Sequence, residues 1–292
     1  MQPQEGLFHS PGEYSGIAVL RLSRNVALPQ LREVVSSIHA ELSTANGLHT
    51  VLGLEPALVS ETASPPPLLP REGPKARFPS TQAHVLVQVS AGEREPLLWA
   101  LRRVLALSQA VLYLQEEVLG GRIGEGREAF GFRDGLVRPT REQMRRAAII
   151  ASGPLTGCSW LLYQRYQQDL SLFSHLKPGA QERVVGRTRE GELVVDAPAE
   201  AHIHRARAAG TGEEQRIIRR GFPFRQSGEE GLVFVAASAD LDYYRRSLDA
   251  LLGANGQTPD AMLRYATAVS GGLYLAPPRG WFHPVSQREV TP

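Results

Sequence analysis

The order of apolar segments in the first half of the chain constrains the fold more than any other feature of the sequence. Short apolar runs, typical of strands, alternate with segments whose apolar residues recur at helical spacing. This pattern predicts strands at 15–22, 48–53, 84–90 and 111–120, helices at 28–44 and 95–110, and a proline-rich loop at 60–80. The order strand, helix, strand, strand, helix, strand indicates a ferredoxin-like domain, which is a split β-α-β arrangement.

The second half of the chain repeats this order more loosely. The predicted elements are strands at 158–166, 231–238 and 272–276, with helical segments at 168–176 and 241–252. The stretch from 178 to 227 has little regular pattern, and a long irregular stretch inside a compact domain is usually functional. We therefore predict an α+β fold of two ferredoxin-like domains with antiparallel sheets, one over residues 1–150 and the other over 151–292.

Composition excludes several classes of protein. The chain has 292 residues, of which 42% are hydrophobic, and no run of about 18 apolar residues that would span a membrane. The N-terminus lacks a basic region followed by an apolar one, so we expect a cytoplasmic protein without a secretory signal. Cys158 is the only cysteine, which excludes an internal disulfide and a cysteine-rich metal site. A net charge of +2 without a dense basic stripe argues against nucleic-acid binding.

Three segments contain residues that could carry chemistry, and the first is Gly131-Phe-Arg-Asp134-Gly135. Glycines permit tight backbone turns, and such a pair can present one carboxylate into a cavity. The alternative is a simple turn with a capping aspartate. Spacing alone favours that simpler interpretation.

The second segment, Ala201-His202-Ile-His204-Arg205, carries two histidines. If it is a strand, His202 and His204 point to the same face, which permits a two-histidine metal site. No carboxylate or cysteine sits at a ligand spacing, so a zinc site is not favoured. One histidine could instead be an axial haem ligand. The alternative is two exposed or hydrogen-bonded histidines.

The third segment runs from Arg216 to Phe224 and places Arg219 and Arg220 among apolar residues. A partly buried arginine requires an anionic partner. The partner is either a ligand or a structural carboxylate, and the segment alone does not distinguish the two.

Together the three segments resemble the dye-decolorising peroxidases, a family of haem enzymes. Gly131–Gly135 matches the family's GxxDG motif, and the histidine and arginine segments match its proximal and distal segments in order and spacing. Further matches lie at 157–163, 185–188 and 267–278, so the resemblance covers nearly the whole chain. The short length and the Val-Gly-Arg-Thr segment are most like the compact bacterial branch called type B.

The resemblance implies that the C-terminal domain binds haem b. His202 would be the proximal ligand of the haem iron, with His204 as the fallback. Asp260 would accept a hydrogen bond from the other ring nitrogen of His202. A hydrogen-bond partner of this kind makes the ligand more basic. The alternative for Asp260 is a helix N-cap. Arg187 and Arg205 are the candidates for holding the haem propionates, and each is otherwise a surface arginine.

On the opposite side of the haem, the resemblance assigns peroxide cleavage to two residues. Asp134 would act as acid and base, moving a proton between the two peroxide oxygens. Arg219 would stabilise the negative charge on the departing oxygen. The implied reaction is the reduction of hydrogen peroxide through a ferryl intermediate and the oxidation of a small aromatic, phenolic or dye-like donor.

Two positions depart from the type B pattern. Leu136-Val-Arg-Pro139 stands where many relatives have Thr-Glu-Asn-Pro, and Gly221 stands where some have asparagine. The first departure puts the propionate contacts and the shape of the channel in doubt.

The remaining alternatives are a haem- or porphyrin-handling protein and a non-haem binding module. The pair Asp134 and Arg219 favours peroxidase chemistry, because carriage of haem requires neither. The resemblance also implies a homo-oligomer. No clear peptide for docking into an encapsulin shell is visible in the tail.

Overall fold

Nine strands of the described residues pair into one antiparallel sheet that closes on itself, and two short strands form a separate hairpin. The computed structural model describes residues 1–61, 63, 65, 67–122, 124–134, 136, 138–207 and 216–283. In this part of the chain the strand order is β7-β11-β2-β5-β1-β6-β9-β10-β8, and an additional pairing of β7 with β10 completes a ring. Residues 284–292 lie outside the described residues.

The N-terminal half has the predicted order of elements. Its sheet runs β2-β5-β1-β6, the strand order of a ferredoxin-like domain. The elements are β1 (Tyr14–Leu22), α1 (Leu28–Thr44), β2 (Leu48–Leu54), β5 (Val85–Ala91), α3 (Arg94–Ser108) and β6 (Leu112–Gly121). Two short elements, β3 (Arg71–Glu72) and β4 (Arg77–Phe78), form a hairpin inside the predicted loop, and α2 (Pro56–Val59) precedes it.

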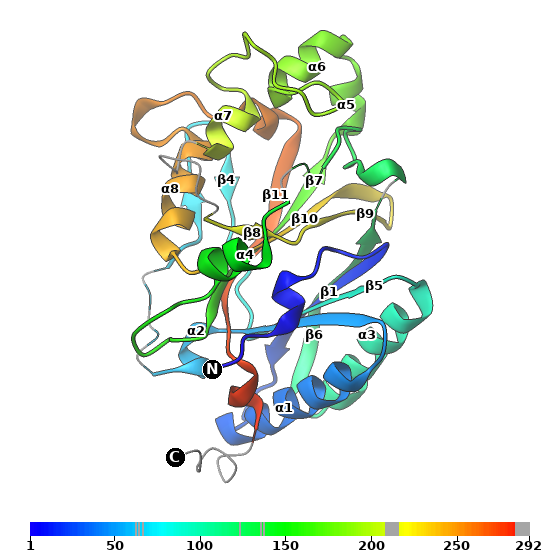
Figure 1. The fold of residues 1–292 in the computed structure, drawn as a ribbon, viewed down its shortest axis with the longest axis vertical. Helices are drawn as coiled ribbons and strands as arrows, with labels where there is room; N and C mark the ends of the chain where they lie inside the picture. The colour runs from blue at the N-terminus through cyan, green and yellow to red at the C-terminus, as the bar shows by residue number, and fades with distance from the viewer. Residues whose placement is uncertain are drawn as a thin grey trace.

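The buried core of the N-terminal half explains why the spacing of apolar residues predicted its helices and strands. The buried residues of α1 include Leu31, Val35, Ile38 and Leu42, which recur at helical spacing and face the sheet. β5 is buried along its whole length because it lies between two strands and beneath the helices. Figure 1 shows α1 and α3 side by side at one end of the molecule.

The C-terminal half has the same strand order, β11-β7-β10-β9. Its principal elements are β7 (Ser159–Gln168), β8 (Ile218–Arg219), β9 (Phe222–Gln226), β10 (Glu229–Ser238), α8 (Leu241–Leu252) and β11 (Ala266–Ala276). The predicted fold class, two ferredoxin-like arrangements with antiparallel sheets, is therefore confirmed. The two halves are joined by the β2–β11 and β6–β9 pairings. The domain boundary at residue 150 stays a prediction.

The stretch predicted to be irregular contains several short elements. They are α6 (Pro178–Val185), α7 (His202–Arg207), β8 and β9. Before this stretch lie α4 (Arg141–Ala148), which precedes β7, and α5 (Leu170–Ser174), which follows β7. The histidine segment forms a helix, not the strand on which His202 and His204 would share a face. The N–H groups of His204 and Arg205 donate to the carbonyl of Ala201 at 3.0 and 3.2 Å, which begins a helix. Residues two apart on a helix point to different sides, so the shared face expected for His202 and His204 does not exist.

No helix in the described ranges combines the length and the apolar character that a bilayer crossing requires. Short 3₁₀ segments complete the fold: η1 (Glu5–Phe8), η2 (Gly124–Gly126), η3 (Ala254–Gly256), η4 (Ala261–Arg264) and η5 (Arg279–Phe282).

The η5 segment is held on α1 by a buried histidine. The ring of His39 stacks on Phe282 with centroids 4.0 Å apart. Burial, together with the charges of Arg279 and His283, lowers the pKa of His39 from 6.5 to about 4. Because the unfolded chain then binds more protons than the folded one, stability is lost as the pH falls from 6.5 towards 4.

We expect His39 to contribute about 2 to 3 kcal/mol of acid destabilisation across this range. The variant His39→Phe keeps the ring stacked on Phe282 but removes the titrating group, so its free energy of unfolding should fall less between pH 7 and pH 4. Urea unfolding at both pH values measures the difference. Equal pH dependence in the two proteins would contradict this assignment.

Candidate active site

His202 and Asp260 form the central contact of the site. His202 begins α7, and Asp260 lies directly before η4, after α8 has ended. Asp260 Oδ2 lies 2.6 Å from Nδ1 of His202, and the Asp260 side chain is only 1% exposed. Its other oxygen, Oδ1, accepts a hydrogen bond from the N–H of Met262 at 2.8 Å. Asp260 therefore both caps η4 and holds the imidazole, so its two expected roles occur together.

The environment of His202 is set by several charges. Burial lowers its pKa, but the charge and hydrogen bond of Asp260 outweigh this, and the net pKa is raised. The positive charge of Arg219 lowers the pKa of His202, and the negative charge of Glu128 raises it. Both groups thus lie within electrostatic reach of the imidazole. The His202 side chain is 44% exposed, so its ring is held on one side and open on another.

Asp134 lies at the end of a turn that is tied down by hydrogen bonds. Its N–H donates to the carbonyl of Gly126 at 2.9 Å, and its side chain is exposed. Gly131, in the middle of the turn, has a φ of +86°, and a Cβ there would lie 2.6 Å from Nη1 of Arg189. Glycine is therefore required at the first position of the motif. The second glycine, Gly135, lies outside the described residues, as does Val137.

Glu128 supports the Asp134 turn and was not recognised from the sequence. Its Oε2 and Oε1 accept hydrogen bonds from the N–H groups of Phe130 and Phe132 at 3.0 and 3.1 Å. Burial raises the pKa of Glu128, these two hydrogen bonds lower it, and the nearby charge of Asp134 raises it further, with a raised pKa as the result. Glu128 therefore interacts electrostatically with both Asp134 and His202. The only signal for Glu128 in the sequence is its position three residues before Gly131.

Arg219 and Arg220 have different surroundings. Arg219 lies in β8, paired with Ala236 of β10, and its side chain is exposed, whereas Ile218 beside it is buried. Burial lowers the pKa of Arg220 to about 10. Arg220 donates to the carbonyls of Leu7 and Arg219 at 3.1 and 2.8 Å.

No carboxylate of the described residues lies within ion-pair distance of Arg220, so the structural-carboxylate alternative is not met for this arginine, whereas the ligand alternative stays a prediction. Backbone carbonyls satisfy its N–H groups instead.

Gly221 is explained by the close approach of two strands. A Cβ at this position would lie 2.3 Å from the carbonyl oxygen of Val233 in β10. The asparagine of some relatives therefore does not fit here without movement of the backbone. At the other departure, Leu136 packs over Gly191, where an added Cβ would lie 2.6 Å from its side chain.

Three arginines lie around α7. Burial and the charge of Arg207 lower the pKa of Arg187, so these two cations lie near each other. Arg187 donates to the carbonyl of Gly191. Arg205 donates to Oε1 of Gln257 at 2.8 Å, while its Nε is buried and has no hydrogen-bond partner within the described part of the chain. Arg207 lies on the same short helix as Arg205, but it was not among the predicted site residues.

Within the described ranges, no group of three or more histidine, cysteine, aspartate or glutamate side chains is arranged to hold a metal ion. His204 is exposed on α7.

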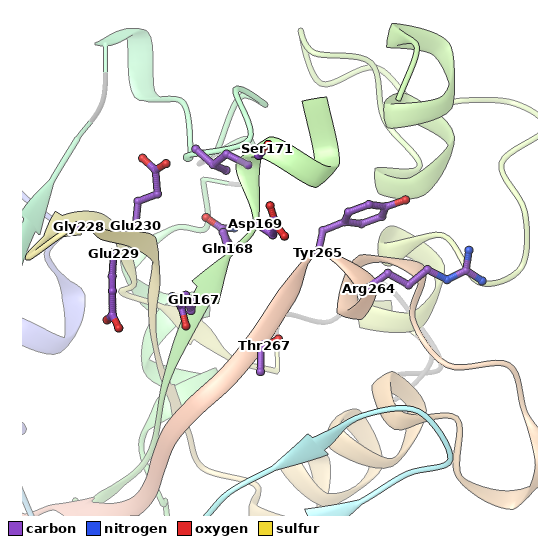
Figure 2. Close-up of a pocket in the computed structure, with 11 residues that line it drawn as sticks. Gln167, Gln168, Asp169, Ser171, Gly228, Glu229, Glu230, Arg264, Tyr265 and Thr267 are labelled. Carbon is purple, nitrogen blue, oxygen red and sulfur yellow. The ribbon is translucent and has the colours of Figure 1, made fainter. Parts of the chain in front are cut away.

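A pocket of about 480 Å³ lies away from the predicted residues (Figure 2). Its walls come from the ends of β7 and β11 and from the β9–β10 turn, and include Gln168, Glu229, Glu230, Arg264 and Tyr265. None of the six predicted site residues lines it. Through Nε2 of Gln168, which lies 3.5 Å from Oε2 of Glu128, this wall adjoins the support of the Asp134 turn.

Comparison with known proteins gives related sequences of one kind. The dye-decolorizing peroxidase of Mycobacterium tuberculosis is 27% identical over 220 residues, which cover 72% of this chain and 66% of that protein. The dye-decolorizing peroxidase of Mycolicibacterium paratuberculosis is 29% identical over 214 residues, covering 70% of this chain and 60% of that protein. The chain thus matches slightly less than two thirds of the length of these relatives.

Solved structures match over nearly the full chain. A dye-decolorizing protein from V. cholerae is 26% identical with a TM-score of 0.84, covering 95% of this chain and 97% of that one. A Rhodococcus jostii RHA1 DypB variant in complex with heme is 25% identical with a TM-score of 0.87, covering 96% and 97%. The family model for the C-terminal part of Dyp-type peroxidases matches residues 125–280, just over half of the chain. These residues include the Asp134 turn, His202, Arg219 and Asp260, and the chain belongs to the Dyp-type peroxidase family.

Proposed function

We propose that the protein is a haem-dependent peroxidase that reduces hydrogen peroxide and oxidises a small aromatic, phenolic or dye-like donor. The observation that carries the proposal is the contact between His202 Nδ1 and Asp260 Oδ2 at 2.6 Å. An imidazole held in this way has one nitrogen fixed by a carboxylate and the other available as a ligand, the arrangement typical of metal-binding histidines.

The chemistry of the donor set fits haem. Haem offers an iron that binds one imidazole nitrogen and two anionic propionates that require cations. His202 would bind the iron through Nε2, and the neighbouring cations Arg187 and Arg207 would hold the propionates, with the unpartnered Nε of Arg205 as a further donor. The DypB variant of similar fold that was solved in complex with heme supports this assignment. When bound, haem supplies the redox-active iron at which the peroxide bond is reduced.

The protein's own residues then manage protons and charge. Asp134 would accept a proton from one peroxide oxygen and donate it to the other, which is the transfer that precedes cleavage of the O–O bond. Arg219, whose positive charge lowers the pKa of His202, would stabilise the negative charge on the departing oxygen. Asp260 would hold the N–H of His202 and so keep the ring in one orientation. The balance is one peroxide, two protons and two electrons from the donor, giving two waters.

The wild-type protein expressed with a haem precursor tests the function. We expect a Soret absorption band that changes on addition of one equivalent of peroxide and returns when a phenolic donor is added. A band that does not respond to peroxide would favour haem carriage, and the absence of a band would exclude the haem assignment. The homo-oligomer stays a prediction, and association with an encapsulin shell stays open.

A further inference from the structure

Glu128 is a partly buried carboxylate to which the proposed chemistry gives no role. Its negative charge raises the pKa of His202, and the negative charge of Asp134 raises the pKa of Glu128. A carboxylate removed from water is costly unless its oxygens are hydrogen-bonded. Each of its two oxygens accepts a backbone N–H, from Phe130 and Phe132.

The backbone of Glu128 closes the same turn that its side chain supports. Its N–H donates to the carbonyl of Phe132 at 3.0 Å, and its carbonyl accepts from the N–H of Gly131 at 2.8 Å. Four hydrogen bonds from one residue therefore determine the path of residues 130–132. Asp134 follows two residues later and is fixed by its own N–H bond to Gly126.

A second set of contacts holds the turn from outside. Arg127 donates to the carbonyl of Gly131 at 3.1 Å and to Oε1 of Glu190 at 2.7 Å, and Arg189 donates to the carbonyl of Phe130 at 3.1 Å. The side chain of Glu190 is 61% exposed, so its ion pair lies in solvent. Exposed pairs contribute little, whereas hydrogen bonds to a shielded carboxylate contribute more.

We propose that Glu128 is a positioning residue, which fixes the backbone of the Asp134 turn so that the Asp134 carboxylate is held in place for proton transfer. The proposal rests on the proposed peroxidase function and adds to it a residue that acts only through Asp134. A misplacement of about 1 Å in a reacting group can cost roughly a hundredfold in rate.

The first test uses the full-length, haem-free chain and does not depend on activity. In Glu128→Gln the amide replaces one acceptor by a donor, so at least one of the two backbone N–H bonds is lost. We expect amide hydrogen exchange at Phe130 and Phe132 to become roughly 10- to 100-fold faster, while exchange in β5 is unchanged. Unchanged exchange at both amides would overturn the proposal.

The second test asks whether Glu128 acts through Asp134. In the haem-loaded protein, Glu128→Gln should lower kcat/KM for hydrogen peroxide by roughly 10- to 100-fold, leave KM for the donor nearly unchanged and leave the Soret band in place. In an Asp134→Asn background the same change should cost less than about threefold, because the residue being positioned is already disabled. Equal losses in both backgrounds would show that Glu128 acts independently and would overturn the proposal.

The variant Glu190→Gln is the matched control. It removes a carboxylate on the exposed side of the same turn. Amide hydrogen exchange at Phe130 and Phe132 and the peroxide activity of this variant should both stay near wild type. If Glu128→Gln does not fold, as judged by circular dichroism, Glu128→Asp keeps the charge but shortens the reach, and a smaller effect in the same direction is expected. Absence of peroxide activity in the wild-type protein would refute the proposed function. The exchange measurement would still decide whether Glu128 fixes the turn.

Discussion

The variant His202→Ala is expected to lose the Soret band of the haem-loaded protein. The reason is that His202 has its Nδ1 held by Asp260 and a half-exposed ring, so it alone among the histidines of α7 is oriented as a ligand. Without an axial imidazole the haem would be retained only by its propionates and by apolar contacts. Absorption spectra of wild type and variant, expressed with the same supply of haem precursor, measure the loss.

Two companion variants make this result specific to the ligand. His204→Ala changes an exposed histidine on the same helix and should keep a wild-type spectrum. Asp260→Asn should reduce haem affinity or peroxide activity by roughly 10- to 100-fold, the usual cost of removing such a partner. A Soret band that survives in His202→Ala and disappears in His204→Ala would reverse the assignment of the ligand.

Most of the fold could be predicted because its periodicities are strong. The helix at 28–44 and the helix at 241–252 were predicted with the observed bounds, since each buries one apolar stripe against the sheet. The last strand begins at Ala266 and not at 272. Its first residues are small and partly polar, so they lack the apolar run that marks a strand. Closure of the sheet between β7 and β10 depends on contacts distant in sequence, which no local pattern contains.

The site was predicted less completely than the fold. The residues with reactive side chains were found from motifs, and His202 and Asp260 do lie in contact although they are 58 positions apart. Glu128 and Arg207, to which we assign roles only as proposals, were not among the predicted residues, because a supporting carboxylate and a third arginine have no sequence signature of their own. The sequence left the conformation of the His202 segment open, because an apolar residue between two histidines fits a strand and a short helix equally well. The structure separates these alternatives through the bonds to Ala201.

The second large effect is expected for Asp134 and Arg219. Asp134→Asn removes the only group proposed to carry the proton between the peroxide oxygens. General acid and base groups contribute roughly 10²- to 10⁴-fold to such steps, so kcat/KM for hydrogen peroxide should fall by that factor. Arg219→Gln removes the cation proposed to stabilise the departing oxygen and should cost roughly 10²- to 10³-fold. Stopped-flow mixing of the haem-loaded variants with peroxide measures both.

The controls separate these roles from general loss of structure or charge. Asp242→Asn changes an exposed aspartate that pairs with Arg245 on α8, and Arg225→Ala removes an arginine whose side chain is 84% exposed in β9. Both should react with peroxide at the wild-type rate. Because Asp134 and Arg219 act on different events, a proton transfer and a charge, a loss in only one variant would assign the barrier to that event. Wild-type rates in both variants would remove the pair from the mechanism and leave a haem-binding protein whose peroxide chemistry, if any, is carried elsewhere.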